Sequence, residues 1–392
     1  MTAKERMRQA MSRAIPDRVP VMCQLALGHY FLHAGLSPFD IWFTNDGFAE
    51  ALLRLRERYR FDGILVNLPG RDPEIRRRVD RIDRGEKVDT IVWRNGGTTR
   101  LPHDDNAHYT PPPGSRPVPG FPEIDPDRLY YVEPWDATGV SYPYCWDFES
   151  GPRPSDDFFP PYCTDTIRAV VQRAGGEVSV HSEVFSPFSQ FLELLGYEVG
   201  LTSLLDDASK VHACLARLGE GAADLARRQI ACGVEAVLIS SAFAGGGFIS
   251  RDQYAEFVQP YERRLVDAVK AGGDTFVYTH TCGAIGDRLD LMVETGTDGI
   301  DTLDPPPLGT VELAEAKAFL AGKVFIKGNI DSVNTLLLAS QEDFEADVRR
   351  RLAIGKVGGG YILSSACSVA PHVAPERLLR LAELAEDVGR YD

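Results

Sequence analysis

The amino-acid sequence predicts an α/β protein built as a (β/α)8 TIM barrel, and three observations support this prediction. Eight short apolar runs of β-type residues recur along the 392-residue chain. Most of them are separated by segments of helical periodicity, and several of these segments end in glycine, the residue expected just past a helix C-terminus. Apolar strands that alternate with amphipathic helices indicate a parallel sheet covered by helices, and eight such units favour a closed barrel over an open sheet.

The predicted elements follow one another in a regular order from the N-terminus. The strands are expected at residues 18–24, 62–67, 176–182, 234–241, 274–280, 298–303, 323–329 and 360–365. The helical segments are expected at residues 48–59, 206–233, 251–273, 286–296, 311–322 and 340–359. No glycine-rich phosphate-binding fingerprint follows the first strand, which weakens the dinucleotide-binding form of an open sheet.

A long insertion, at about residues 69–175, follows the second predicted strand. Its first part, KVDTIVWRNGGTTRLP, predicts a β-hairpin that turns at the Asn-Gly-Gly of residues 95–97. The stretch at about 101–165 is rich in proline and carries more aromatic residues than a solvated linker needs. We interpret it as a lid over the barrel mouth, with an oligomer interface as the alternative, and we treat residues 1–392 as a single domain.

Composition restricts the partners and the compartment. The net charge of −15 argues against a general binder of nucleic acid or anionic membranes, because no basic stripe offsets it. No apolar run approaches the roughly 18 residues that a membrane helix needs, and the charged N-terminal segment lacks the apolar region of a signal peptide. Seven cysteines at irregular spacing indicate reduced thiols. We therefore expect a soluble, cytoplasmic protein that acts on a small molecule, and a homodimer is compatible with the sequence.

Polar side chains fall at or just beyond the C-terminal ends of the predicted strands, whereas the strands themselves are apolar. In (β/α)8 barrels the residues that carry chemistry lie at these ends. The candidate site residues are Gln24, Asn67, Glu183, His280, Cys282, Asp301, Asp304, Asn329 and Cys367.

His280 and Cys282 stand two positions apart in YTHTCGAIGD, so both side chains can face one metal ion. Imidazole and thiolate together favour Zn²⁺ over magnesium or calcium. Cys367 is the expected third ligand, because the fifth and eighth strands open on the same mouth. Three protein ligands and one exchangeable position are typical of a catalytic zinc. Asp304 and Glu183 are candidates for a fourth ligand or a base.

Alternatives stay open for the same residues. A cysteine–histidine nucleophile pair is the other functional interpretation, although it leaves Cys367 without a role, and a buried histidine with inert thiols is the structural one. Either Asp301 or Asn329 could orient His280. The expected substrate pocket comprises Gln24, Asn67, Asp301 and Asn329, together with Tyr144 and Trp146 from the insertion.

Residues 176–385 resemble the uroporphyrinogen decarboxylase superfamily in the stretches VFSPFSQFLELLGYE, HTCGAIGDRLDLMVETGTDGID, FIKGNID and GGYILSSACSVAPHVAPERL. The H-x-C motif followed much later by a single cysteine resembles the zinc-dependent corrinoid methyltransferase branch, which includes the methylcobamide:coenzyme M methyltransferases. His280, Cys282 and Cys367 match the zinc-ligand motif of that branch one for one. The resemblance implies the same barrel fold.

The resemblance further implies a methyltransferase that moves a methyl group between a corrinoid protein, or another methyl donor, and a thiol or similar acceptor, with zinc activating the thiolate. The chain has no cobalamin-binding D-x-H-x-x-G motif, so a corrinoid (cobalamin) would come on a separate protein. A decarboxylase is disfavoured, because CQLALGHY lacks the two substrate-binding arginines of true decarboxylases and Asn67 stands where an aspartate is expected. A non-catalytic zinc-binding barrel is the other alternative.

Overall fold

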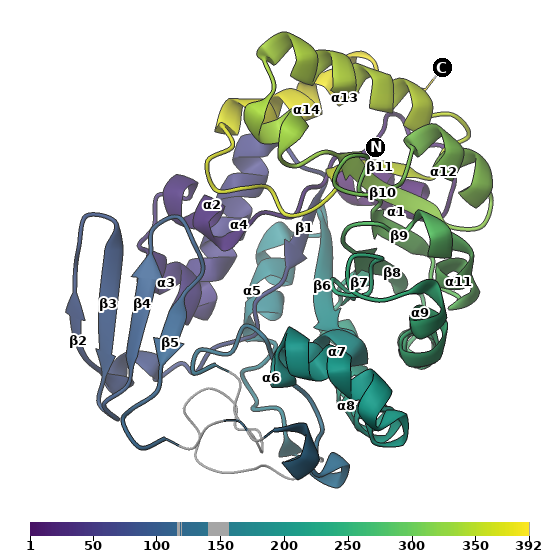
Figure 1. Ribbon diagram of the computed structural model, residues 1–392. Coiled ribbons are helices and arrows are strands. Elements are labelled where there is room, and N and C mark those ends of the chain that lie inside the picture. The colour runs from purple at the N-terminus through teal and green to yellow at the C-terminus, as the bar shows by residue number, and fades with distance from the viewer. Residues whose placement is uncertain (116–117, 119, 140–156, 392) are drawn as a thin grey trace.

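The structure, a computed structural model, describes residues 1–115, 118, 120–139 and 157–391 (Figure 1). Its main body is an α/β fold around one curled parallel sheet, with helices on the outside. The sheet has the order β1 (Gly63–Val66), β6 (Ser179–Phe185), β7 (Ala236–Ser240), β8 (Phe276–Thr281), β9 (Gly299–Thr302), β10 (Phe325–Ile330) and β11 (Tyr361–Ser365). Seven of the eight predicted strands are therefore present, and the fold is TIM-barrel-like.

The prediction of a strand at residues 18–24 is wrong, although this segment does pair with the sheet. Leu363 N–H donates to the carbonyl of Pro20, and Met22 N–H donates to the carbonyl of Leu363. On the other side, Asp62 N–H donates to the carbonyl of Val21. The segment thus bridges β11 and the start of β1, the two edges of the curled sheet. The pairing stays short because Pro20 has no N–H to continue a ladder.

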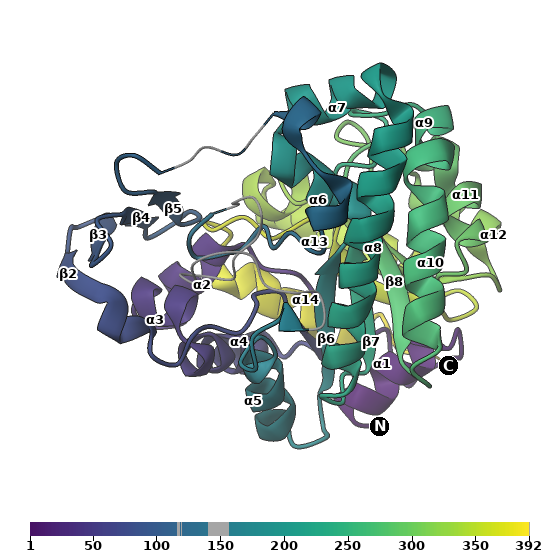
Figure 2. The same ribbon diagram turned by 90° about the horizontal axis from the view of Figure 1, so that it is seen from below.

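Helices cover the outer face of the sheet. Figure 2 shows α8 outside β6 and β7 and α10 outside β8, in agreement with their contacts. The predicted helix at 251–273 is divided near Val258, because Pro260 cannot donate the hydrogen bond that a continuous helix needs. None of the helices in the described residues combines the length and apolar character needed to cross a membrane. The α-helices are α1 (Ala3–Met11), α2 (Leu27–His33), α3 (Pro38–Phe43), α4 (Asn45–Tyr59), α5 (Asp165–Ala174), α6 (Pro187–Leu195), α7 (Tyr197–Asp206), α8 (Ala208–Ile230), α9 (Arg251–Phe257), α10 (Gln259–Lys270), α11 (Leu289–Glu294), α12 (Leu313–Leu320), α13 (Gln341–Gly355) and α14 (Pro375–Asp387).

A second, antiparallel sheet lies between β1 and α5 in the chain and stands beside the parallel sheet (Figure 1). Its strands are β2 (Val79–Asp83), β3 (Val88–Trp93), β4 (Thr98–Pro102) and β5 (His108–Thr110), paired in that order. The pairing of β3 with β4 confirms the predicted hairpin. Its turn uses Gly96 at a φ of +89°, and the Asn95 side chain accepts the N–H of Gly97.

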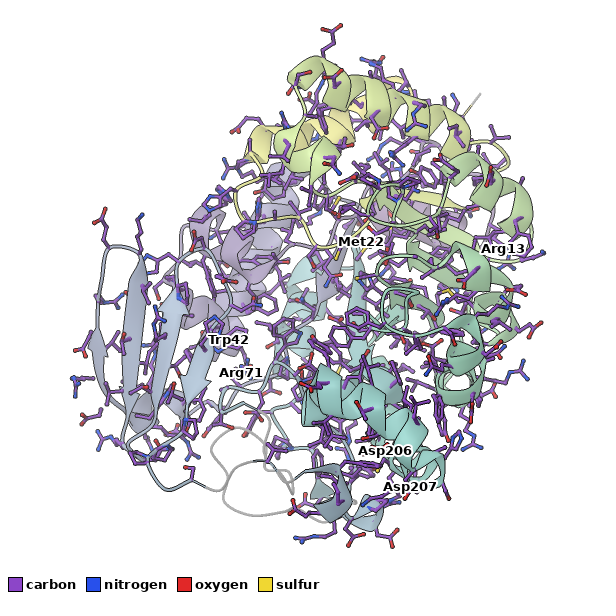
Figure 3. The ribbon with its side chains drawn as sticks, viewed as in Figure 1. Arg13, Met22, Trp42, Arg71, Asp206 and Asp207 are labelled. Carbon is purple, nitrogen blue, oxygen red and sulfur yellow. The ribbon has the colours of Figure 1, made fainter. Side chains whose placement is uncertain are left out.

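Aromatic side chains join α3 to the insertion. Trp42 of α3 packs edge-to-face against Trp135, with 6.2 Å between ring centroids. The Arg71 guanidinium lies 4.9 Å from the centroid of Trp42, and Figure 3 shows the two residues between the antiparallel sheet and the barrel. Arg71 is buried and donates to the backbone carbonyls of Trp42 and Trp135. This contact holds the chain on both sides of β2–β5 against the main body.

The inside of the curled sheet is filled by its own apolar cluster. Because side chains alternate between the faces of a strand, every second residue of each strand points inward. Side chains from α1 close the N-terminal end of this interior, so the polar residues further along each strand face the other end. The buried cluster consists of Met7, Ala10, Met11, Met22, Leu65, Ala236, Leu238, Tyr278, Phe325 and Ile362.

A buried ion cluster ties α1 to the two edges of the sheet. The carboxylate of Asp62, just before β1, accepts hydrogen bonds from the guanidinium groups of Arg6 and Arg18. It also accepts the N–H of Val21 at 2.8 Å. Asp62 is 1% exposed and compensates the charge of Arg18, while Arg6 shares its charge between Asp62 and Asp17.

We expect Asp62→Asn to lower the free energy of unfolding by about 3 kcal/mol, because it removes the buried carboxylate that pairs with Arg18 and one of the two carboxylates that pair with Arg6. Guanidinium chloride denaturation measures the change. The exposed Asp80, replaced in the same way by asparagine, is the control and should change stability by less than about 0.5 kcal/mol. Equal denaturation midpoints for the two variants would contradict the expected role of Asp62.

Candidate metal centre

Three side chains that the sequence predicts as ligands meet at the C-terminal end of the parallel sheet. His280 lies near the end of β8, Cys282 follows β8, and Cys367 follows β11. Their ligand atoms all lie within 4.8 Å of one another, and no other described residues form such a group of three or more His, Cys, Asp or Glu side chains. The Sγ of Cys282 is 3.3 Å from Nε2 of His280 and 3.6 Å from the Sγ of Cys367.

The turn that carries Cys282 is fixed by close backbone packing. Gly283 adopts a φ of +78°, which allows the chain to turn directly after the cysteine. Its N–H donates to Oδ2 of Asp304 at 2.6 Å. A Cβ atom at Gly245 would lie 2.2 Å from the carbonyl oxygen of Cys282, so only glycine permits this approach. The position of Cys282 therefore depends on loops that follow three different strands.

Cys367 is held by the loop that follows β10. Its N–H donates to the hydroxyl oxygen of Ser332 at 3.0 Å, and the same hydroxyl donates to its carbonyl at 3.1 Å. Ala366 N–H donates to the carbonyl of Ile330. The thiol of Cys367 is thus placed beside that of Cys282, across 85 residues of sequence.

His280 is oriented by a buried carboxylate. Its Nδ1 lies 3.0 Å from Oδ2 of Asp301, and Lys327 Nζ donates to both oxygens of Asp301 at 3.0 and 3.1 Å. With Nδ1 donating to Asp301, Nε2 faces the two thiols, where a bound metal ion would take the place of its proton. Of the two predicted partners for His280, Asp301 is the one in contact. Asn329 instead hydrogen-bonds the carbonyl of Leu303 and the guanidinium of Arg351.

Without a metal ion, His280 and Cys367 favour a charged pair of imidazolium and thiolate. Burial opposes the charge on His280, but its hydrogen bonds with Asp301 and Cys367 outweigh burial and raise its pKa to about 10. The hydrogen bond from Cys282 holds the pKa of Cys367 well below its usual value, and the pKa of Cys282 is correspondingly raised. The protein alone thus stabilises one thiolate, and a second thiolate requires a further positive charge. Two thiolates and one imidazole form a donor set that fits zinc.

Two acids predicted to act at the metal lie outside this group of three. Burial raises the pKa of Asp304 to about 6, and the hydrogen bond from Gly283 opposes this rise. Burial raises the pKa of Glu183, on β6, to about 7, and its Oε2 accepts no hydrogen bond from a described residue. Tyr144 and Trp146, the predicted aromatic contributions to the pocket, lie outside the described residues.

Two residues near this site, Lys327 and Glu133, do not belong to the predicted set. Lys327 stands inside the apolar strand β10 and is buried. A lysine within an apolar strand is the sequence signal of a buried acidic partner, which here is Asp301. Glu133 belongs to the aromatic-rich stretch, where no pattern distinguishes it. It is 9% exposed, burial raises its pKa to about 8, and its carboxyl interacts electrostatically with Glu183.

The chain is similar in sequence to a known protein family. Residues 146–388 match the family described as Uroporphyrinogen decarboxylase (URO-D). The uroporphyrinogen decarboxylase of Saccharopolyspora erythraea is 33% identical over 177 residues, which cover 44% of this chain and 47% of the relative. That of Thioalkalivibrio sulfidiphilus is 27% identical over 243 residues, which cover 58% of this chain and 65% of the relative. The chain thus spans between about half and two-thirds of the length of these curated relatives.

A solved structure extends the likeness over the full chain. A methyltransferase from Methanosarcina mazei superimposes with a TM-score of 0.70 and covers 99% of both chains. The two sequences are 15% identical, so this likeness establishes the shared fold.

We expect Asp301→Asn to weaken metal binding by about 10- to 100-fold, because the amide neither orients His280 nor balances Lys327 as the carboxylate does. Competition with a chromogenic zinc chelator measures the affinity. Asp287→Asn, at an exposed position shortly after Cys282, is the matched control and should leave it unchanged. Equal affinities of the two variants would show that Asp301 does not orient the ligand.

The two buried glutamates predict a pH dependence of stability. Burial raises the folded-state pKa of Glu183 to about 7 and that of Glu133 to about 8, above the ordinary value of 4.5. The unfolded chain then loses protons at lower pH than the folded chain, so the free energy of unfolding should fall as pH rises from about 4.5 to about 8. Denaturation at fixed ionic strength measures this fall. It should be smaller in the Glu133→Gln, Glu183→Gln double variant, and equal slopes would contradict the assignment.

Proposed function

The chain belongs to the uroporphyrinogen decarboxylase family, and from this premise we propose that it is a zinc-dependent methyltransferase. It would move a methyl group between a corrinoid protein, or another methyl donor, and a thiol or similar acceptor. The observation that carries the proposal is the group of His280, Cys282 and Cys367, whose ligand atoms lie within 4.8 Å of one another. The likeness in fold to a methyltransferase over 99% of the chain supports it.

Zinc bound to these three side chains would supply an open position for a thiol and would lower its pKa, so that the nucleophilic thiolate is available near neutral pH. Asp301 keeps the Nε2 of His280 directed at the site. Cys282 and Cys367 would supply two negative charges. These charges would weaken the bond between the metal and the thiolate of the acceptor, so that this thiolate stays nucleophilic. His280 is buried and the two cysteines are partly buried, which limits the access of water.

The thiol proton needs an acceptor, and two carboxyls of the chain are candidates. Glu183 is buried and its pKa, raised by burial to about 7, suits proton exchange at neutral pH. Asp304 contacts the turn that follows Cys282 through Gly283, and its pKa of about 6 is also suitable. We propose that one of them serves as the base or as a fourth ligand.

Decarboxylation is the second candidate, since the curated relatives carry that name. A tetrapyrrole with several carboxylates needs cationic groups at the mouth of the barrel. Two buried cations of the described structure are already engaged: Lys327 with Asp301, and Arg71 with the carbonyls of Trp42 and Trp135. Carboxyl groups line this end instead, which favours methyl transfer.

The partner that carries the corrinoid would be a separate protein, because the chain has no cobalamin-binding D-x-H-x-x-G motif. We further propose that the protein works in the cytoplasm, where reduced thiols persist. The alternative is a barrel that binds zinc but has no activity, and a methyl-transfer assay distinguishes it from the enzyme.

We expect purified protein to hold about one zinc per chain and to transfer methyl groups from methylcobalamin to a small thiol. The Cys282→Ala, Cys367→Ala double variant should lose the metal and the transfer while it stays folded, because neither thiol belongs to the apolar core clusters. Elemental analysis and a thiol-methylation assay measure the two effects.

Cys232→Ala removes a partly buried thiol that follows α8 and is not a proposed ligand, and this variant is the control that should keep both. Full zinc retention in the double variant would refute the ligand assignment. Zinc binding without any methyl transfer would favour the non-catalytic barrel.

A further inference from the structure

Three neighbouring positions at the mouth of the barrel hold buried oxygen atoms that accept no hydrogen bond from a described residue. They are Oε1 of Gln24, Oδ1 of Asn67 and Oε2 of Glu183. Asn67 is 9% exposed and Glu183 is 8% exposed. Leaving a buried acceptor without a donor destabilises a fold, so such atoms indicate a ligand that supplies donors.

The three side chains lie side by side on the inner face of the sheet. Met22 and Leu65 belong to the cluster inside the barrel, so Gln24 and Asn67, each two residues later, also point inward. Val66 pairs with Ser182 in the parallel register, which places Asn67 beside Glu183. His181 faces the interior, where it contacts the Tyr278 hydroxyl, and Glu183 lies two residues further toward the mouth.

A fourth acceptor reaches the same place from the insertion. Val132 N–H donates to Oε1 of Gln190 at 2.9 Å, which holds this segment over the start of α6. Glu133, the next residue, is 9% exposed, and its carboxyl interacts with that of Glu183. The hydroxyl of Tyr131 donates to Glu133 at 3.5 Å. The mouth thus collects two carboxyls and two amide oxygens.

No cation of the described residues forms an ion pair with Glu183 or Glu133. Lys327 acts on Glu183 electrostatically, but its hydrogen bonds go to Asp301. Arg71 interacts electrostatically with Glu133, while it donates to the carbonyls of Trp42 and Trp135. An anionic ligand would therefore meet carboxyl groups here, whereas a cation with N–H donors would satisfy the unpartnered oxygens.

We propose that the substrate of this site carries an ammonium group that donates hydrogen bonds to Gln24, Asn67 and Glu183. Together with Glu133, these three residues form what we call the acceptor wall. The substrate class is thus a primary or secondary ammonium compound, not a sulfonate or carboxylate. This inference rests on the proposed function, because it assigns the substrate of the same site. Glu183 sets the specificity through its charge and lies near the metal ligand His280.

Calorimetric titration of the zinc-loaded protein at fixed ionic strength tests the inference with ethylammonium and ethanesulfonate, two probes of similar size and opposite charge. We expect ethylammonium to bind at least about tenfold more tightly, since charge-assisted hydrogen bonds form with one probe only. Glu183→Gln should weaken ethylammonium about tenfold or more. Glu342→Gln, at an exposed position on α13, is the control and should not change the affinity.

Thermal unfolding of each variant shows whether it is folded. If the Glu183→Gln variant does not fold, the comparison of the two probes on the unaltered protein tests the inference. Equal or tighter binding of ethanesulfonate overturns the inference, as does unchanged ethylammonium affinity in a folded Glu183→Gln variant. A comparison of methyl transfer to cysteamine and to 2-mercaptoethanesulfonate distinguishes a failure of this inference from a failure of the proposed function. Transfer that prefers the sulfonate would refute the ammonium site alone, whereas ammonium binding without any transfer would refute only the methyltransferase.

Discussion

The buried contact between His280 and Asp301 is the interaction on which the geometry of the site depends. Burial alone would raise the pKa of Asp301, but the Lys327 ammonium and the His280 ring lower it, so the carboxylate stays charged in the interior. A charged carboxylate fixes the proton of His280 on Nδ1 and leaves Nε2 to face the thiols. The three residues come from the neighbouring strands β8, β9 and β10, so the curvature of the sheet sets the direction of the imidazole.

The two ends of the barrel interior have opposite characters, and this polarity separates stability from chemistry. Apolar side chains of the strands and of α1 fill the N-terminal end, and the Asp62 ion cluster ties α1 to both edges of the sheet. Polar side chains occupy the C-terminal end, where several buried oxygen atoms form no hydrogen bond with a described residue. Such unpartnered groups destabilise a fold unless a ligand satisfies them, so the apolar end must compensate for the cost of the polar one.

Electrostatics link the metal ligands to the acceptor wall. The group of His280, Cys282 and Cys367 stabilises one thiolate by itself and favours a divalent cation. Burial raises the pKa of Glu183 to about 7 and that of Glu133 to about 8, so a positive charge bound beside them would favour their ionised forms. Both parts of the mouth thus offer groups suited to positive charge, one through sulfur and nitrogen and the other through oxygen.

Local patterns in the sequence were enough to predict the α/β class, seven of the strands, and His280 and Cys282 as candidate ligands, and Cys367 followed from its place at the end of the last predicted strand. The prediction of a strand at 18–24 failed because backbone pairing depends on both neighbouring strands, and Pro20 shortens it. The tertiary structure was needed to show that Asp301, and not Asn329, is the partner of His280. It was also needed to show that Lys327 and Glu133 lie near the site. These choices depend on which side chains face inward at one level of the barrel, and residues far apart in the chain reach that level only after the sheet has curled.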